Sequence, residues 1–404
     1  MFAQFKNFLS AKPEGVTQSY LVECESLRGF AILLVVLFHG FLELKYPHDS
    51  NPSILSSYIR EGQTGVTLFF VLSGFLLSLG LLNQTKFNAS RFYINRILRI
   101  VPLYSLWVIT AGIFFQKLYD TLTALLFWDL SIYKLYPFGT TWWSLMVEVQ
   151  FYLLLPWLIL LFKSPQWRWS LWPLLILASL FYLDITGHWD WLADKWFVVP
   201  DPKSSLFGRW PAFLCGALLA WIHQRYGHKL REKFQAQAWL AKGGGDTILF
   251  GLILLLGLEL KWIASMDQMS AFLYYFDHFA IEAFLWTLLV ATILYLPLFT
   301  ARLWVNPLWN FFGLISYSLY LCHGVVIFFG FRHIPTLLTS TLSITLSHEQ
   351  LIALCILIAI VFSVVSYHFI EKPALRLKTK LIKQSAGPLD SNESLGKDSS
   401  YESR

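Results

Sequence analysis

Long apolar runs, separated by shorter polar segments, recur along almost the whole chain. A helix needs about 20 mostly apolar residues to cross the roughly 30 Å of hydrocarbon in a bilayer. Runs of about this length lie at 28–45, 64–83, 101–117, 144–162, 170–186, 207–224, 246–266, 277–298, 309–331 and 350–371. The pattern therefore predicts an all-α, polytopic integral membrane protein with about ten transmembrane helices.

The composition favours membrane spans over one large soluble core. Only 14% of the 404 residues are charged, 18% are aromatic, and the mean hydropathy is +0.54. A soluble domain has about a quarter of its residues charged, so this chain lacks the charge to cover a soluble surface. The four cysteines show no CxxC spacing, and they predict neither a metal site nor a disulfide framework.

The Lys and Arg residues divide unequally between the two sides of the predicted bundle. With a cytoplasmic N-terminus, 22 of them fall inside and 7 outside. Because cytoplasmic segments carry the excess of basic residues, both termini are predicted to be cytoplasmic. We expect a cytoplasmic N-terminal segment (1–27) without a cleavable signal, a transmembrane domain (28–373), and a cytoplasmic tail (374–404) that is disordered toward its end.

Two ionisable residues, Arg28 and His39, fall within the first span. Such residues cost about 2.5–3.5 kcal/mol at a helix centre and therefore suggest a function. At about 100° per residue their separation puts both on one helix face, about 16 Å apart along the axis, with Arg28 at the cytoplasmic edge. A snorkelling Arg and a structural His are the alternative interpretation.

Arg96 and Arg99 follow the second span and share one face if their segment is helical. Arginine matches phosphate geometry, so the pair could clamp phosphates that arrive from the cytosol. The alternative is that they only obey the positive-inside rule.

Polar residues also interrupt the second and fourth spans. Ser73 lies in the second span beside a glycine, where small residues permit close helix packing. Glu148 lies just over one turn inside the outer edge of the fourth span, and Tyr152 follows four residues later. A carboxylate at that depth needs a partner, and His39 is the expected one; a structural Glu near a water-filled rim is the alternative.

Two further features lie near the end of the bundle. His323 falls in the ninth span and has either a functional or a structural role. Glu371 and Lys372 end the tenth span, and we interpret them as a capped helix end.

Six short motifs occur in a fixed order between about Glu25 and Pro373. They are Arg28-x10-His39, Phe69-Phe70-Val71-Leu72-Ser73-Gly74-Phe75, Arg96-x-x-Arg99-Ile100-x-Pro102-x-Tyr104, Trp143-Ser144-Leu145-x-Val147-Glu148-x-x-Phe151-Tyr152, Ser316-Tyr317-x-Leu319-Tyr320-Leu321-x-His323 and Ile370-Glu371-Lys372-Pro373. With these motifs the chain resembles the acyltransferase-3 family of membrane O-acyltransferases. Thr67 departs from the pattern, because many members have an acidic residue there.

The resemblance implies a ten-helix core that transfers an acyl group, acetyl in particular, from cytosolic acyl-CoA to a hydroxyl of an extracytoplasmic glycan or glycosylated acceptor. No metal is expected. The expected partners are acyl-CoA, a carbohydrate acceptor, the lipid bilayer of the cell membrane, and a homo-oligomer or glycan-assembly partner, with no nucleic acid. Some members carry a fused hydrolase-like domain; we expect none after the last predicted span of this sequence, and we expect any second step to need a partner protein.

This transfer requires a base and a group that stabilises the oxyanion. We expect His39 to be the general base, with Glu148 orienting its imidazole. Tyr152, Ser73 or backbone N–H groups could stabilise the oxyanion, and a covalent acyl-His intermediate is an alternative route. The residues expected to bind the donor are Arg28, Arg96, Arg99 and Ser73.

A transporter or flippase of a glycan or lipid-linked substrate is the alternative function, since buried charges also line transport paths. Transporter folds often contain inverted repeats. No segment after residue 200 clearly repeats the pattern of the Arg28-to-His39 half, so the sequence favours the enzyme over the transporter.

Overall fold

The computed structural model describes residues 21–44, 51–84, 87–127, 135–163, 206–266 and 275–377, and all its regular elements are helices. The long helices are α2 (Val22–Leu44), α4 (Thr64–Leu82), α5 (Ala89–Phe115), α7 (Trp142–Lys163), α10 (Leu206–Gln235), α11 (Gly245–Ser265), α13 (Tyr275–Tyr295), α16 (Ser316–Leu342) and α17 (His348–Ser366). The short ones are α3 (Ile54–Arg60), α6 (Leu118–Leu125), η1 (Phe138–Thr141), η3 (Leu240–Gly244), α14 (Ala301–Trp304), α15 (Pro307–Leu314) and η4 (Tyr367–Glu371).

Eight helical segments of the described residues are long and apolar enough to cross a membrane. They correspond to eight of the ten predicted spans, and the chain is a multi-pass membrane protein. The predicted span 170–186 lies outside the described residues. The predicted span 207–224 lies in α10, which is not among the eight, because its second half is rich in basic and other polar residues.

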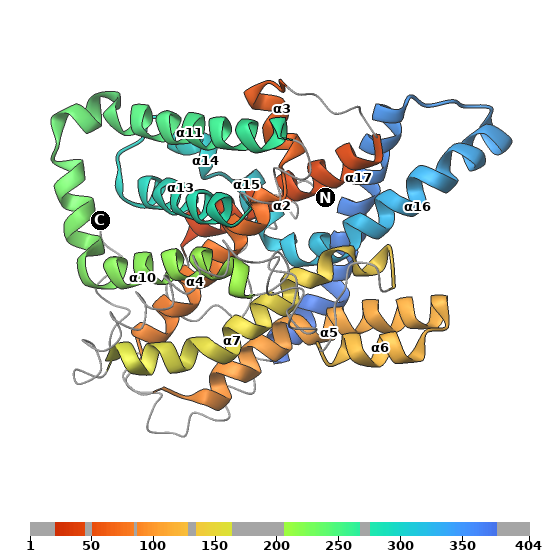
Figure 1. Cartoon of the computed structure of the whole chain (residues 1–404), viewed down its shortest axis with the longest axis horizontal. Coiled ribbons are helices and arrows are strands. Elements are labelled where there is room, and N and C mark those ends of the chain that lie inside the picture. The colour runs from red at the N-terminus through yellow and green to blue at the C-terminus, as the bar shows by residue number, and fades with distance from the viewer. Residues whose placement is uncertain are drawn as a thin grey trace.

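Figure 1 shows α2 and α4 near the centre of the bundle, with α10, α11 and α13 on one side and α16 and α17 on the other. Helices α5, α6 and α7 fill the lower part of the same view. α2 contacts α4, α13, α15, α16 and α17, so it links the two halves. Its polar residues are therefore surrounded by other helices rather than by lipid.

Glycines bring α4 and α10 into backbone contact. A Cβ added to Gly74 would overlap the carbonyl oxygen of Phe213, and one added to Gly216 would overlap that of Val71. The Phe213 ring then stacks on Phe70, with the ring centroids 4.7 Å apart. Small residues at such crossings allow the helices to pack closely, which places α10 against the core.

Three helix boundaries differ from the predicted ones in ways that affect polar residues. α2 begins at Val22, so Glu25 joins Arg28 inside the helix. α5 begins at Ala89, which confirms that the segment with the two predicted arginines is helical. The predicted span 309–331 is broken at Ile315 into α15 and α16, and α15 packs against the first turns of α2.

Large apolar side chains remain exposed on the outer faces of several helices. Examples are Leu106, Ile109 and Ile113 on α5, Leu254, Leu255 and Leu258 on α11, and Val361, Phe362 and Val365 on α17. Contiguous apolar surface of this kind marks an interaction surface, and on membrane-length helices the natural contact is lipid.

Candidate functional site

A cavity of about 340 Å³ runs along α4. Its α4 wall extends from Val66 to Gly80, and Asn83 and Gln84 continue it beyond the helix. At 1.5 Å per residue, the distance from Val66 to Asn83 is about 25 Å. The other walls come from α2, α5, α7, α15, α16 and η4. The volume is in the range of small-molecule sites.

Three arginines predicted to bind a donor, Arg28, Arg96 and Arg99, line one end of this cavity. We call it the arginine end. Nη2 of Arg28 donates a hydrogen bond to Ser316 Oγ at 3.0 Å, and Nη1 lies 3.9 Å from Glu25 Oε2. Arg28 thus has a carboxylate neighbour, and it still lines the cavity together with Arg96 and Arg99.

The predicted residues of α4 and α7 line the same cavity. Ser73 Oγ donates to Glu148 Oε1 at 3.0 Å. Tyr152 lies beside Glu148, and the Arg96 guanidinium is 5.8 Å from the centroid of the Tyr152 ring. The structure therefore brings six of the seven predicted site residues to one cavity.

Glu371 also lines the arginine end, contrary to its interpretation as part of a capped helix end. It is only 3% exposed, and Ser318 Oγ donates to its Oε2 at 2.9 Å. It interacts electrostatically with Arg99 and Arg28. The residue lies in the π-helical turn η4, and such turns are frequent at functional sites. The sequence signal was an acidic residue inside the predicted tenth span.

The opposite end of the cavity carries a pair of hydroxyl groups from α7 and α16. Ser144 Oγ and Tyr320 Oη form a hydrogen bond of 2.6 Å, and both residues line the cavity. The Tyr320 ring packs against Phe69 of α4, with centroids 6.3 Å apart. We call this the hydroxyl end.

His39 does not line the cavity. It lies near the hydroxyl end, where His323 packs between His39 and Tyr320. The His323 ring centroid is 6.0 Å from that of Tyr320 and 4.9 Å from that of His39. His39 Nδ1 lies 3.2 Å from His323 Nε2 and 2.9 Å from the Val35 carbonyl oxygen. His323 Nδ1 lies 2.9 Å from the carbonyl oxygen of Leu319.

These contacts assign the hydrogens of the two imidazoles. A carbonyl oxygen only accepts, so Nδ1 carries the hydrogen in both rings. His39 Nδ1–H then donates to Val35 and to Nε2 of His323, and both rings can be neutral. Within the described residues His39 Nε2 makes no hydrogen bond and keeps a free lone pair. That is the form a general base requires.

The expected contact between Glu148 and His39 is absent from the described residues. Along α7, Glu148 lies four residues, about 6 Å, from Ser144 toward the arginine end. Along α16, His323 lies three residues, about 4.5 Å, past Tyr320 in the opposite direction. Because Ser144 pairs with Tyr320, Glu148 and the histidine pair are separated by about 10 Å along the cavity, and Ser73 is the neighbour of Glu148.

The described residues contain no group of three or more His, Cys, Asp or Glu side chains that could hold a metal ion. The arginine end instead offers donors suited to phosphate, and the hydroxyl end offers neutral hydrogen-bonding groups. This polarity fits a ligand that is anionic at one end and neutral at the other.

Known proteins resemble this chain over most of its length. Residues 22–369 match the sequence model of the acyltransferase-3 family, described as an acyltransferase domain. The chain is 24% identical over 387 residues to the peptidoglycan O-acetyltransferase OatA of Listeria monocytogenes, covering 88% of this chain and 56% of the relative. It is 25% identical over 341 residues to the O-acetyltransferase OatA of Staphylococcus aureus, covering 77% and 51%.

The chain thus spans about half the length of these relatives. No solved structure matches it. The family match covers most of the chain, so the chain belongs to the acyltransferase-3 family.

Proposed function

We propose that this protein transfers an acetyl group from cytosolic acetyl-CoA to a hydroxyl of an extracytoplasmic glycan, with His39 as the general base. The observation that carries the proposal is a cavity that extends from three arginines to Tyr320, whose ring contacts the His323–His39 pair. The names of the relatives, which are O-acetyltransferases, support the reaction type, and that of the Listeria protein supports a peptidoglycan-type acceptor.

Arg28, Arg96 and Arg99 would hold the CoA phosphates, because guanidinium groups bind phosphate oxygens in bidentate pairs. The pantetheine arm would follow α4 toward Ser144 and Tyr320, which brings the thioester next to the histidine pair. Glu148, which accepts a hydrogen bond from Ser73, would position the side chains of the arginine end rather than orient His39.

The reaction balances without another reactant. His39 Nε2 takes the proton of the acceptor hydroxyl while its oxygen attacks the thioester carbonyl. The Tyr320 or Ser144 hydroxyl can donate to the oxyanion that forms. Collapse forms the ester C–O bond and breaks the C–S bond, and His39 returns the proton to the departing CoA thiolate. A covalent acyl-His39 intermediate uses the same atoms in two steps.

The test is transfer by the purified protein in detergent or nanodiscs. Acetyl-CoA carrying a labelled acetyl group is incubated with a tetrasaccharide of N-acetylglucosamine, and both the labelled ester and free CoA are quantified. The proposal predicts equal amounts of the two products. Transport of the glycan across liposomes without ester formation would instead favour a flippase and contradict the proposal.

A further inference from the structure

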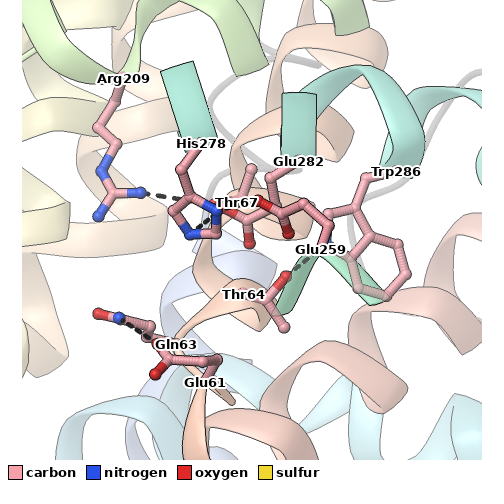
Figure 2. Close-up of polar contacts among 9 residues, drawn as sticks. All are labelled: Glu61, Gln63, Thr64, Thr67, Arg209, Glu259, His278, Glu282 and Trp286. Atoms are coloured by element: carbon pink, nitrogen blue, oxygen red, sulfur yellow. Dashed lines mark hydrogen bonds and ion pairs between the residues drawn. The ribbon is translucent and has the colours of Figure 1, made fainter. Parts of the chain in front are cut away.

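A second group of buried ionisable side chains lies outside the cavity, where α4, α10, α11 and α13 meet (Figure 2). Arg209 of α10 is 3% exposed, and His278 of α13 is 2% exposed. His278 Nδ1 hydrogen bonds with Glu259 of α11, and its Nε2 lies 3.7 Å from Glu282 Oε2. A guanidinium group does not lose its proton in a protein, so Arg209 places a permanent positive charge in this buried group.

The Arg209 guanidinium is held by contacts with α4 and α13. Its Nη1 donates to Thr67 Oγ1 at 3.5 Å, and the same hydroxyl donates to Glu282 Oε2 at 2.9 Å. Its Cζ lies over the Phe279 ring, 3.4 Å from the centroid, and arginine favours such contact with an aromatic face. The positive charge therefore has a fixed place in the bundle, and Thr67 links it to the Glu282 carboxylate.

This charge lies beside the hydroxyl end of the cavity. The Cζ of Arg209 is 5.2 Å from the ring centroid of Trp143, which precedes Ser144 at the start of α7. Ser144 Oγ in turn forms the 2.6 Å hydrogen bond with Tyr320 Oη. The charge of Arg209 also interacts electrostatically with Tyr320. The hydroxyl pair that faces the reaction thus has a fixed cation next to it.

Acetyl transfer develops negative charge on the carbonyl oxygen of the thioester. A hydroxyl that donates to this oxygen becomes a stronger donor when a fixed positive charge lies behind it in a medium of low dielectric constant. We propose that Arg209 is a positioning residue for the reaction, whose charge polarises the Tyr320 hydroxyl as a donor to the oxyanion. This inference rests on the proposed function, because it takes the hydroxyl end as the place where the oxyanion forms. In the alternative role, Arg209 only neutralises the buried carboxylates and stabilises the fold.

The first test measures transfer of labelled acetyl from acetyl-CoA to the N-acetylglucosamine tetrasaccharide by Arg209→Met and Arg209→Lys. At an effective dielectric constant of about 20, a unit charge about 10 Å from a developing charge changes a rate roughly 10-fold. We therefore expect Arg209→Met to lower kcat about 10-fold at an unchanged Kd for acetyl-CoA. Arg209→Lys, which keeps the charge, should have a kcat between those of Arg209→Met and wild type. Arg225→Met, at an exposed arginine of the same helix, is the matched control.

A double-mutant cycle distinguishes action through Tyr320 from a structural role. If the charge acts through the Tyr320 hydroxyl, Arg209→Met should lower kcat about 10-fold in wild type but less than about 2-fold in Tyr320→Phe. A purely structural role would give the same loss in both backgrounds. If Arg209→Met does not fold, Arg209→Gln takes its place in the cycle, since Gln keeps a donor for Thr67 without the charge.

A wild-type kcat in the neutral variant, or an equal loss in both backgrounds, would overturn the inference. So would a parallel rise in the Kd for acetyl-CoA, or an Arg209→Lys variant that is no faster than Arg209→Met. Absence of transfer by the wild-type protein would contradict the proposed function itself, so the two failures are distinguishable.

Discussion

Replacing Glu61 by Gln should stabilise the protein at alkaline pH and have much less effect in acid. Glu61 lies in the turn between α3 and α4, outside the predicted spans, and Gln63 Nε2 donates to its Oε2 at 3.1 Å. Burial raises the pKa of Glu61 from its ordinary 4.5 to about 7, although the hydrogen bond from Gln63 and the charge of His278 oppose the change. The folded protein therefore holds this proton more tightly than the unfolded chain.

The sign and the size of the effect follow from this difference. The protonated carboxyl contributes its full stability below about pH 4.5, and the contribution is lost as the pH rises through about 7. Each tenfold difference in proton affinity corresponds to about 1.4 kcal/mol, so the loss is at most about 3.5 kcal/mol. Gln cannot ionise, so Glu61→Gln does not suffer this loss.

Thermal unfolding in detergent, followed by tryptophan fluorescence, measures the difference between variant and wild type at pH 5 and pH 8. We expect the variant to gain a few degrees in Tm relative to wild type at pH 8 and little at pH 5. Glu349→Gln, which changes an exposed carboxylate, should show no such trend. A difference that is the same at both pH values, or larger at pH 5, would refute the reasoning.

Three further predictions concern the donor site, the helix packing and the hydroxyl end. Arg96→Ala combined with Arg99→Ala should raise the Kd for acetyl-CoA about 100-fold or more by removing two charge-assisted contacts, measured by calorimetry; an unchanged Kd would move the phosphate site elsewhere. Gly74→Leu should force α4 from α10 and lower the Tm, whereas Gly80→Leu, where a Cβ meets open space, should not; equal effects would contradict the packing argument. Tyr320→Phe should lower kcat about 10- to 1000-fold at unchanged acetyl-CoA Kd, and an unchanged kcat would exclude its hydroxyl from catalysis.

The sequence identified several of the polar residues that line the cavity, because each interrupts or borders an apolar run. Arg28, Ser73, Glu148 and Tyr152 all line it. It could not identify their partners. Helical periodicity gives the face of one helix, but the partner depends on which helix lies opposite and at what height. For this reason the sequence alone predicts His39 as the partner of Glu148, whereas the partner in the structure is Ser73.

The same limit explains the residues that were missed. From the sequence, Glu371 is interpreted as part of a capped helix end. Its hydrogen bond with Ser318 joins two helices, and the pattern of a single helix cannot predict such a contact. Glu259 and Glu282 both fall within predicted spans, so the signal was present. The sequence does not show that they share a partner. The packing of α11 and α13 places His278 between them. The predicted span 207–224 does form a helix, α10, which packs against α4, but α10 is not among the eight membrane-length apolar helices.

The role of His39 is the central claim, and His39→Ala tests it most directly. A general base contributes about 100- to 10,000-fold to rate, so the variant should lose at least 100-fold in acetyl transfer to the tetrasaccharide while its Kd for acetyl-CoA is unchanged. His333→Ala, at an exposed histidine of α16, is the matched control and should transfer normally. Transfer by His39→Ala at a rate near that of wild type would contradict the account.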